Sequence, residues 1–312
     1  MRTGRCLVLG GAGFMGSHLV ELLVEEGFPV RVFDLPEAAS RLRAGIAGKI
    51  DIEEGDFQEL ERLARVVEGC EFVFHLIGTT RPASANRNPV FDLESNLLAT
   101  VRLLEACVRA KVRQVIFPSS GGTVYGVAQS VPLPETHPTE PRTSYGITKL
   151  AIEKYLALFH RLHGLDYTVL RIANAYGPRG PLHGEQGAVG VFLSRLKRGQ
   201  PLTVWGDGSV TRDYVYAGDV ARAFRAALGQ ESPFRVFNIG TGVGTSLVEL
   251  IACMERVTGR PAALEKRPAR PTDVPTNVLD GTRARQHLGW EPATPLDAGL
   301  ARTWKWIQAT ET

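Results

Sequence analysis

Short apolar runs alternate with helix-like segments over the first half of the chain. Five runs rich in Val, Ile, Leu and Phe, each bounded by Gly, Asp or Pro, have the character of strands buried on both faces: Cys6–Leu9, Val30–Phe33, Phe72–Leu76, Val115–Phe117 and Tyr167–Ile172. Segments with helical spacing lie between them, at Gly16–Glu26, Leu60–Val67, Ser95–Ala110 and Ser144–Leu162. This alternation predicts a doubly wound, Rossmann-type α/β fold, in which helices cover both faces of a parallel sheet.

The pattern becomes less regular after Ile172. Helical segments at Val189–Arg198, Val220–Leu228 and Ser246–Thr258 alternate with short strands such as Val236–Ile239. We therefore expect residues 1–172 to form the sheet domain, with part of 217–240 returning to it. Residues 173–312 should form mainly a smaller, mixed substrate lobe packed on that domain.

Composition narrows the class of protein. The 312 residues are 44% hydrophobic and 22% charged, with a net charge of +3. No block of like charge indicates a nucleic-acid or membrane partner, and no apolar run approaches the ~18 residues of a membrane span. The four cysteines, Cys6, Cys70, Cys107 and Cys253, are far apart and indicate free thiols rather than disulfides or a metal site. We expect a cytoplasmic protein.

A glycine-rich turn follows the first predicted strand. Gly10, Gly13 and Gly16 have the spacing G-x-x-G-x-x-G and open the first predicted helix. Glycines there permit a tight turn and close approach of the backbone to a pyrophosphate, and the helix N-terminus supplies N–H donors. A strand before and a helix after are the context that a dinucleotide site requires.

The second predicted strand ends at Asp34, about 20 residues further on, where a carboxylate accepts hydrogen bonds from the adenosine ribose and repels a 2′-phosphate. This favours NAD over NADP. Asp56, after the third strand, is a candidate for the adenine amino group, and a plain loop carboxylate is the alternative.

A tyrosine and a lysine begin the helix predicted at Ser144–Leu162. Tyr145 and Lys149 are four residues apart and share one helical face. An ammonium group stabilises phenolate over phenol, so we expect Lys149 to lower the pKa of Tyr145 toward neutrality. The pair is thus a candidate catalytic base and its activator.

Several sequence motifs follow one another along the chain, and their order makes a resemblance to one protein family specific. They run from GGAGFMGSHL through FVFHLIG, SSGGTVYG and Tyr145-x-x-x-Lys149 to RIANAYGP, RDYVY and RPTD. Over nearly its whole length the chain resembles the NAD-dependent nucleotide-sugar epimerase/dehydratase family of extended short-chain dehydrogenases/reductases.

This resemblance implies an NAD-dependent enzyme and assigns residues to it. It implies cofactor contacts from the glycine loop, the strand ends and the dyad: Gly10, Gly13, Phe14, Met15, Gly16, Asp34, Asp56, Phe57, Leu76, Ile77, Gly78, Asn96, Tyr145 and Lys149. It implies that Asn174, Arg212 and Arg270 bind the sugar diphosphate. For the two arginines the chemistry is suitable, because guanidinium groups pair well with phosphate oxygens.

The implied reaction is 4-epimerisation of a nucleotide-diphosphate hexose through a transient 4-keto sugar, with UDP-glucose and UDP-galactose or their N-acetylated or uronic forms as substrates. A 4,6-dehydratase needs two carboxylates where this chain has Gly122 and Thr123, which argues against elimination. Asp34 disfavours an NADPH-consuming reductase. A non-catalytic NAD-binding protein stays open, because the chain departs from the family at one position.

That departure lies where the family carries a catalytic serine or threonine. Gly121 occupies the position, and Ser120 and Thr123 are the hydroxyls that could replace it. We favour Ser120, which adjoins the usual position. A loop that only satisfies its own backbone is the alternative.

Two further expectations follow from the family. Its members commonly dimerise through two helices, here Ser95–Ala110 and Ser144–Leu162, so we expect a homodimer. A gate residue for sugar size lies four positions after the aspartate of RPTD, which places Asn277 there. Asparagine is smaller than the tyrosine that excludes acetamido sugars, so both plain and N-acetylated hexoses should be accepted. An exposed turn is the alternative for Asn277.

Overall fold

The structure, a computed structural model, describes residues 4–45, 50–184, 187–269 and 274–310. Seven parallel strands form the large sheet, in the spatial order β10-β6-β5-β4-β1-β2-β3. They are β1 (Cys6–Leu9), β2 (Val30–Asp34), β3 (Asp51–Glu54), β4 (Phe72–His75), β5 (Gln114–Ser120), β6 (Asp166–Ile172) and β10 (Val236–Ile239). Because the strand order reverses beside β1, a crevice for ligands is expected at the carboxyl ends of β1 and β4.

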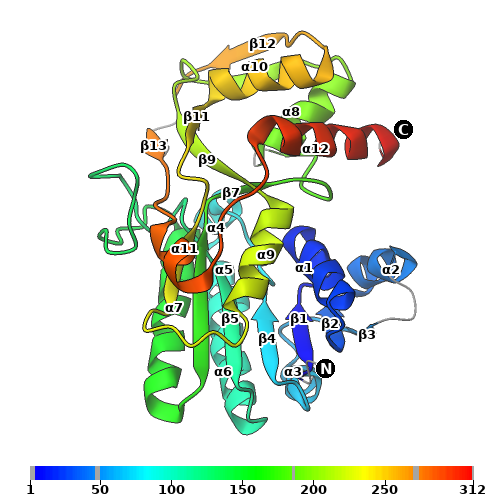
Figure 1. Cartoon of the computed structure of the whole chain (residues 1–312), viewed down its shortest axis with the longest axis vertical. Coiled ribbons are helices and arrows are strands. Elements are labelled where there is room, and N and C mark those ends of the chain that lie inside the picture. The colour runs from blue at the N-terminus through cyan, green and yellow to red at the C-terminus, as the bar shows by residue number, and fades with distance from the viewer. Residues whose placement is uncertain (1–3, 46–49, 185–186, 270–273, 311–312) are drawn as a thin grey trace.

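Helices cover both faces of this sheet, as Figure 1 shows. One apolar core lies under α1 (Phe14–Glu25), α9 (Ala217–Ala227) and α11 (Thr282–Leu288). A second core lies under α3 (Leu60–Val67), α6 (Ala99–Arg109) and α7 (Ser144–His163). The predicted fold class is therefore confirmed.

A smaller lobe lies beyond the carboxyl edge of the large sheet (Figure 1). Its strands are β7 (Asn174–Tyr176), β8 (Leu202–Trp205), β9 (Thr211–Tyr216), β11 (Gly244–Ser246), β12 (Leu264–Arg267) and β13 (Thr276–Asn277). Strand β9 pairs in parallel with β7 and β13 and antiparallel with β11, so these four strands form one mixed sheet. Strands β8 and β12 pair with each other in a separate sheet. Helices α8 (Ala188–Lys197), α10 (Leu247–Thr258) and α12 (Leu296–Thr310) enclose the lobe's own apolar core.

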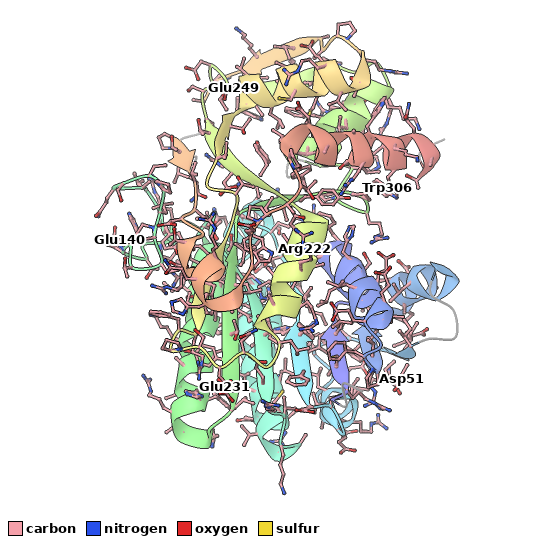
Figure 2. All side chains as sticks on the ribbon, viewed as in Figure 1. Asp51, Glu140, Arg222, Glu231, Glu249 and Trp306 are labelled. Carbon is pink, nitrogen blue, oxygen red and sulfur yellow. The ribbon has the colours of Figure 1, made fainter. Side chains whose placement is uncertain are left out.

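The chain passes between the two parts more than once. After β9 it returns to the large sheet as α9 and β10, and β10 pairs with β6. Asp219 of α9 accepts hydrogen bonds from the backbone of Ala293 and Thr294, in the segment that leads into α12. Arg222, labelled in Figure 2, forms an ion pair with Asp219 at 2.7 Å. These contacts tie the crossing segments to the sheet domain.

The helix predicted at Ser95–Ala110 begins earlier in the structure than the sequence indicated. The helix predicted to begin at Ser95 begins at Pro89, because Asn88 caps it and a proline at the first helical position is preorganised for a helix. It runs as α5 (Pro89–Asp92), a π-helical segment η1 (Leu93–Leu98) and α6. Two shorter helices, α2 (Pro36–Gly45) and α4 (Pro82–Arg87), complete this half. Among the described residues, no helix is long and apolar enough to cross a bilayer.

Candidate active site

The glycine loop has the geometry that a dinucleotide requires. Gly10 has a φ of +79°, which favours glycine, and Gly13 forms the N-cap of α1. A Cβ on Gly16 would collide with the Gly10 carbonyl oxygen, so only glycine allows the helix to approach the loop this closely. Gly13 is exposed, and Phe14 and Met15 are partly buried in the first turn of α1. The N–H groups at this helix start are available to an anion.

Asp34 and the loop after β4 lie beside this turn. One carboxylate oxygen of Asp34 accepts a hydrogen bond from the Ala12 N–H at 2.9 Å. A Cβ on Gly10 would come within 3.0 Å of the Ile77 nitrogen, so the segment Leu76–Gly78 borders the glycine loop. The residues present thus fit NAD: a glycine cradle for the pyrophosphate and a carboxylate at the adenosine-ribose end.

Two other predicted cofactor residues lie one strand further out. The Gly55 N–H donates to the Asp34 carbonyl, which brings the Asp56 turn to the end of β2. Asp56 accepts from the Gln58 N–H at 2.9 Å, and the buried Phe57 ring packs on His75 with centroids 4.9 Å apart. Asp56 therefore lies in a turn at the sheet edge, within reach of the Asp34 end of the site.

The predicted dyad lies at the start of α7. Thr143 caps this helix by accepting from the Gly146 N–H, which fixes its first turn around Tyr145. Lys149 is buried; its Nζ donates to the Pro118 carbonyl at 3.0 Å and lies 5.6 Å from the centre of the Tyr145 ring. The lysine therefore connects the catalytic helix to the end of β5.

The structure reverses one electrostatic expectation. Burial raises the pKa of Tyr145 to about 12, and the nearby carboxylate of Asp92 acts in the same direction. The predicted lowering is therefore wrong for the protein without ligand, because burial disfavours the charged phenolate. Burial also lowers the pKa of Lys149 to about 8, against the opposing effects of Asp92 and Glu153.

Sequence reasoning missed two buried carboxylates around the dyad. Glu153, one turn after Lys149, accepts from Ser119 and forms a two-pronged ion pair with Arg171. Asp92 ends α5 and accepts hydrogen bonds from four neutral donors. Glu153 carried a usable signal, the i, i+4 spacing from Lys149, whereas Asp92 belongs to no motif.

The loop that departs from the family is closely packed. A Cβ on Gly121 would collide with the side chain of Leu279, which is fully buried, so leucine occupies the space of the family's serine. The Ser120 carbonyl accepts from the Thr123 and Val124 N–H groups, which closes a tight turn after β5. Thr123 Oγ1 is buried and has no hydrogen-bond partner among the described residues. This orphaned hydroxyl makes Thr123 a stronger candidate than the sequence indicated.

Two of the three residues expected to bind the diphosphate lie in the smaller lobe. Asn174, on β7, donates to the Asp213 carbonyl at 3.3 Å, and Arg212, on β9, donates to the Thr211 and Val274 carbonyls. Both lie in the mixed sheet facing the large domain's carboxyl edge (Figure 1). Arg270 and Asp273 lie outside the described residues.

Asn277 is buried, with 1% of its surface exposed, and this excludes the exposed-turn alternative. Its Nδ2 donates to the Gly121 carbonyl at 3.0 Å, and its Oδ1 has no partner within the described part of the chain.

The side-chain amide of Asn96 stabilises the cofactor loop through hydrogen bonds. Its Oδ1 accepts from the Thr79 N–H at 3.0 Å, and its Nδ2 donates to Thr80 and Asp92. Because these bonds occupy the amide, Asn96 holds the segment that follows Gly78 in place. Its own contact with NAD stays a prediction.

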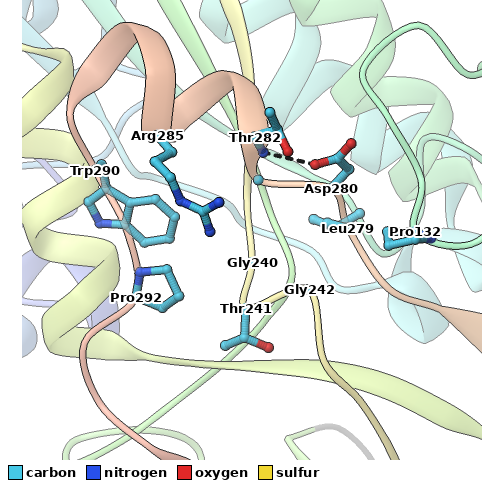
Figure 3. A pocket seen from close by; sticks show the side chains of 11 residues that line it. Pro132, Gly240, Thr241, Gly242, Leu279, Asp280, Thr282, Arg285, Trp290 and Pro292 are labelled. Atoms are coloured by element: carbon cyan, nitrogen blue, oxygen red, sulfur yellow. Dashed lines mark hydrogen bonds between the residues drawn. The ribbon is translucent and has the colours of Figure 1, made fainter.

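A small cavity lies at the start of α11 and contains none of the predicted site residues (Figure 3). Arg285, Trp290 and Pro292 line one side of it, and Gly240–Gly242 and Asp280 line the other. Its volume is about 90 Å³, below the ~300 Å³ at which sites for small organic ligands begin. It is therefore too small for a sugar nucleotide.

Comparison with known proteins agrees with this geometry. The model of the "NAD dependent epimerase/dehydratase family" matches residues 6–240. A UDP-glucose 4-epimerase of Mycolicibacterium smegmatis is 39% identical over 96% of this chain and 97% of its own length.

Two solved structures have nearly the same fold. A Thermotoga maritima UDP-glucose 4-epimerase with UDP-glucose superimposes with a TM-score of 0.93 at 38% identity, covering 99% of this chain and 100% of that one. A Thermus thermophilus UDP-glucose 4-epimerase in complex with NAD gives 0.90 at 34%, covering 98% and 99%.

These matches span the sheet domain and the smaller lobe. They confirm the resemblance inferred from the motifs and the prediction of an enzyme with NAD as its cofactor. The chain belongs to the NAD-dependent epimerase/dehydratase family.

Proposed function

We propose that the protein catalyses NAD-dependent 4-epimerisation of a UDP-hexose, with UDP-glucose and UDP-galactose as the reference pair. The observation that carries the proposal is the composition of the site: an intact Tyr145–Lys149 dyad beside the cofactor loop, with no carboxylate at Gly122 or Thr123. A site with a catalytic base but without the paired carboxylates that eliminate water suits oxidation and reduction at a single sugar carbon. The epimerases to which the chain is similar support the same reaction.

Bound NAD supplies a hydride acceptor that later returns the hydride. Tyr145 takes the proton from the 4-hydroxyl and gives it back after the keto sugar has turned over. Burial raises the pKa of Tyr145 to about 12 in the free protein, so the phenol carries its proton there. The positive charges of Lys149 and of bound NAD would have to lower this pKa before Tyr145 can accept the proton of the sugar. Thr123 or Ser120 orients the hydroxyl, and Asn174, Arg212 and Arg270 hold the diphosphate.

The test is interconversion of UDP-glucose and UDP-galactose by purified protein without added reductant. Tyr145→Phe should lower turnover by ~10²–10⁴-fold while NAD still binds. Tyr155→Phe is the matched control, because Tyr155 is exposed on the same helix and should keep full turnover. Turnover that requires stoichiometric NADPH, or an eliminated product, would contradict the proposal.

The burial of Asn277 supports its role as the gate for sugar size. It lies against Gly121, at the loop where the sugar would meet the dyad. We infer that Asn277→Tyr selectively loses N-acetylated substrates, since overpacking a closed site costs ~1–3 kcal/mol. The measurement is turnover of UDP-GlcNAc beside UDP-glucose for both proteins, and an unchanged ratio would show that the gate lies elsewhere.

We further infer a homodimer. Large apolar side chains are exposed on α5, η1 and α7, among them Phe91, Leu93, Leu98, Ile147 and Leu162. Helices α5 and η1 pack against α7. Exposed apolar side chains on such neighbouring helices suit an interface, and paired helices would bury them as a four-helix bundle.

We infer a cytoplasmic location. Three buried free thiols, at Cys6, Cys70 and Cys107, suit the reducing cytoplasm. We also infer that residues 1–172, with part of 217–240, bind the cofactor, and that 173–312 mainly bind the sugar nucleotide.

A further inference from the structure

Asp92 is a carboxylate with no exposed surface, located at the end of α5 next to the catalytic helix. It accepts from Thr80 Oγ1 at 2.5 Å, from Ser144 Oγ and Thr148 Oγ1 at 2.8 Å each, and from Asn96 Nδ2 at 3.0 Å. All four donors are neutral. A buried carboxylate that contacts no cation among the described residues is costly, so its position beside the candidate active site indicates a function.

The donors come from the elements that the reaction must hold together. Ser144 and Thr148 lie on either side of Tyr145 in the first turns of α7. Thr80 follows the cofactor loop that ends at Gly78. The π-helical segment η1 begins directly after Asp92, and π turns are frequent at functional sites. Asp92 therefore joins the cofactor loop to the catalytic helix.

Lys149 is buried and directly follows Thr148, whose hydroxyl donates a hydrogen bond to Asp92. Four titratable groups face it: Asp92 from α5, His75 from β4, and Tyr145 and Glu153 from its own helix. Glu153 is already neutralised by its two-pronged ion pair with Arg171. Burial lowers the pKa of His75 to about 3, so this imidazole is neutral. Of the two carboxylates in this set, Asp92 is therefore the one that contacts no cation within the described part of the chain.

We propose that Asp92 is a positioning residue of the catalytic dyad, which orients Tyr145 through Ser144 and Thr148 and provides the buried counter-charge of Lys149. The inference rests on the proposed function. Its charge keeps the Lys149 ammonium protonated to higher pH and holds the proton on Tyr145. Removing the charge should therefore lower the pKa of both groups.

The test uses Asp92→Asn, which keeps the shape and removes the charge. NMR of protein labelled with ¹³C at the lysine Cε gives the titration midpoint of Lys149, assigned by its loss in Lys149→Arg. We expect the midpoint to fall by about one pH unit in Asp92→Asn. The pH profile of kcat should move to lower pH by a similar amount, and kcat at its optimum should fall ~10-fold through loss of orientation.

Asp219→Asn is the matched control, because Asp219 is an equally buried helix carboxylate away from the dyad. It should lower the Tm and leave the Lys149 midpoint in place. An unchanged midpoint in Asp92→Asn overturns the proposal, whatever happens to activity. A wild type with no epimerase activity overturns the proposed function instead, while the midpoint still tests Asp92.

If Asp92→Asn does not fold, Ser144→Ala and Thr148→Val each remove one hydrogen bond and keep the charge. Each should lower kcat and leave the Lys149 midpoint unchanged. Full kcat in both variants overturns the positioning role.

Discussion

Replacing Gly121 by serine would restore the hydroxyl that the family carries, and the structure predicts that this change alone will destabilise the protein. The new Cβ would collide with the end of the fully buried Leu279 side chain, which would have to shift against its packed neighbours. Overpacking of this kind costs about 1–3 kcal/mol. Leu279→Ala alone should cost about 2–5 kcal/mol, since it removes a buried side chain and leaves a cavity.

The two changes should compensate each other when combined. The serine would enter the space that the leucine vacates, so the double variant should be more stable than the sum of the single effects by about 1–2 kcal/mol. Urea unfolding of the four proteins measures this coupling. Leu250→Ala is the control, because Leu250 is equally buried in the other lobe and its effect should add to that of Gly121→Ser.

The double variant should also have a higher kcat than Leu279→Ala, because it regains a hydroxyl at the family's position. Strict additivity of Gly121→Ser and Leu279→Ala, within about 0.5 kcal/mol, would refute the steric reasoning.

Three other outcomes are expected. Asp34→Ala should weaken NAD binding and relax discrimination against NADP, because the carboxylate also anchors the Ala12 N–H; a wild type that binds NADP more tightly in fluorescence titrations would contradict this. Thr123→Val should lower kcat more than Ser120→Ala does, because Thr123 Oγ1 is buried and has no hydrogen-bond partner in the described ranges, and the opposite order would return the role to Ser120. Leu98→Glu should give monomers by light scattering while Val248→Glu, exposed on α10, should not; a monomeric wild type would exclude the interface.

The parts predictable from sequence are those determined by local patterns. Strands Cys6–Leu9 and Val236–Ile239 have the bounds that their apolar runs predicted, and the turn Gly10–Gly16 has the expected geometry. The dyad was predictable because Tyr145 and Lys149 are one helical turn apart.

The parts that could not be predicted depend on contacts between distant residues. Asn277 and Gly121 are bonded across 156 residues, and Asp92 bonds Thr148 across 56. The pKa of Tyr145 was predicted in the wrong direction because sequence spacing shows a neighbouring charge but not burial, which raises this pKa. Helix α5 was missed because its start depends on Asn88 and Pro89, ahead of any apolar period.

The return of the chain to the large sheet as α9 and β10 prevents this enzyme from being divided at residue 172. A fragment ending there would leave β6 as an open edge strand and uncover the face of α1 that α9 buries. Open edges of this kind recruit other chains, so such a fragment should aggregate rather than fold as a cofactor-binding module. Any attempt to graft a new substrate lobe onto this cofactor lobe must therefore keep residues 217–239 and insert the foreign segments around them.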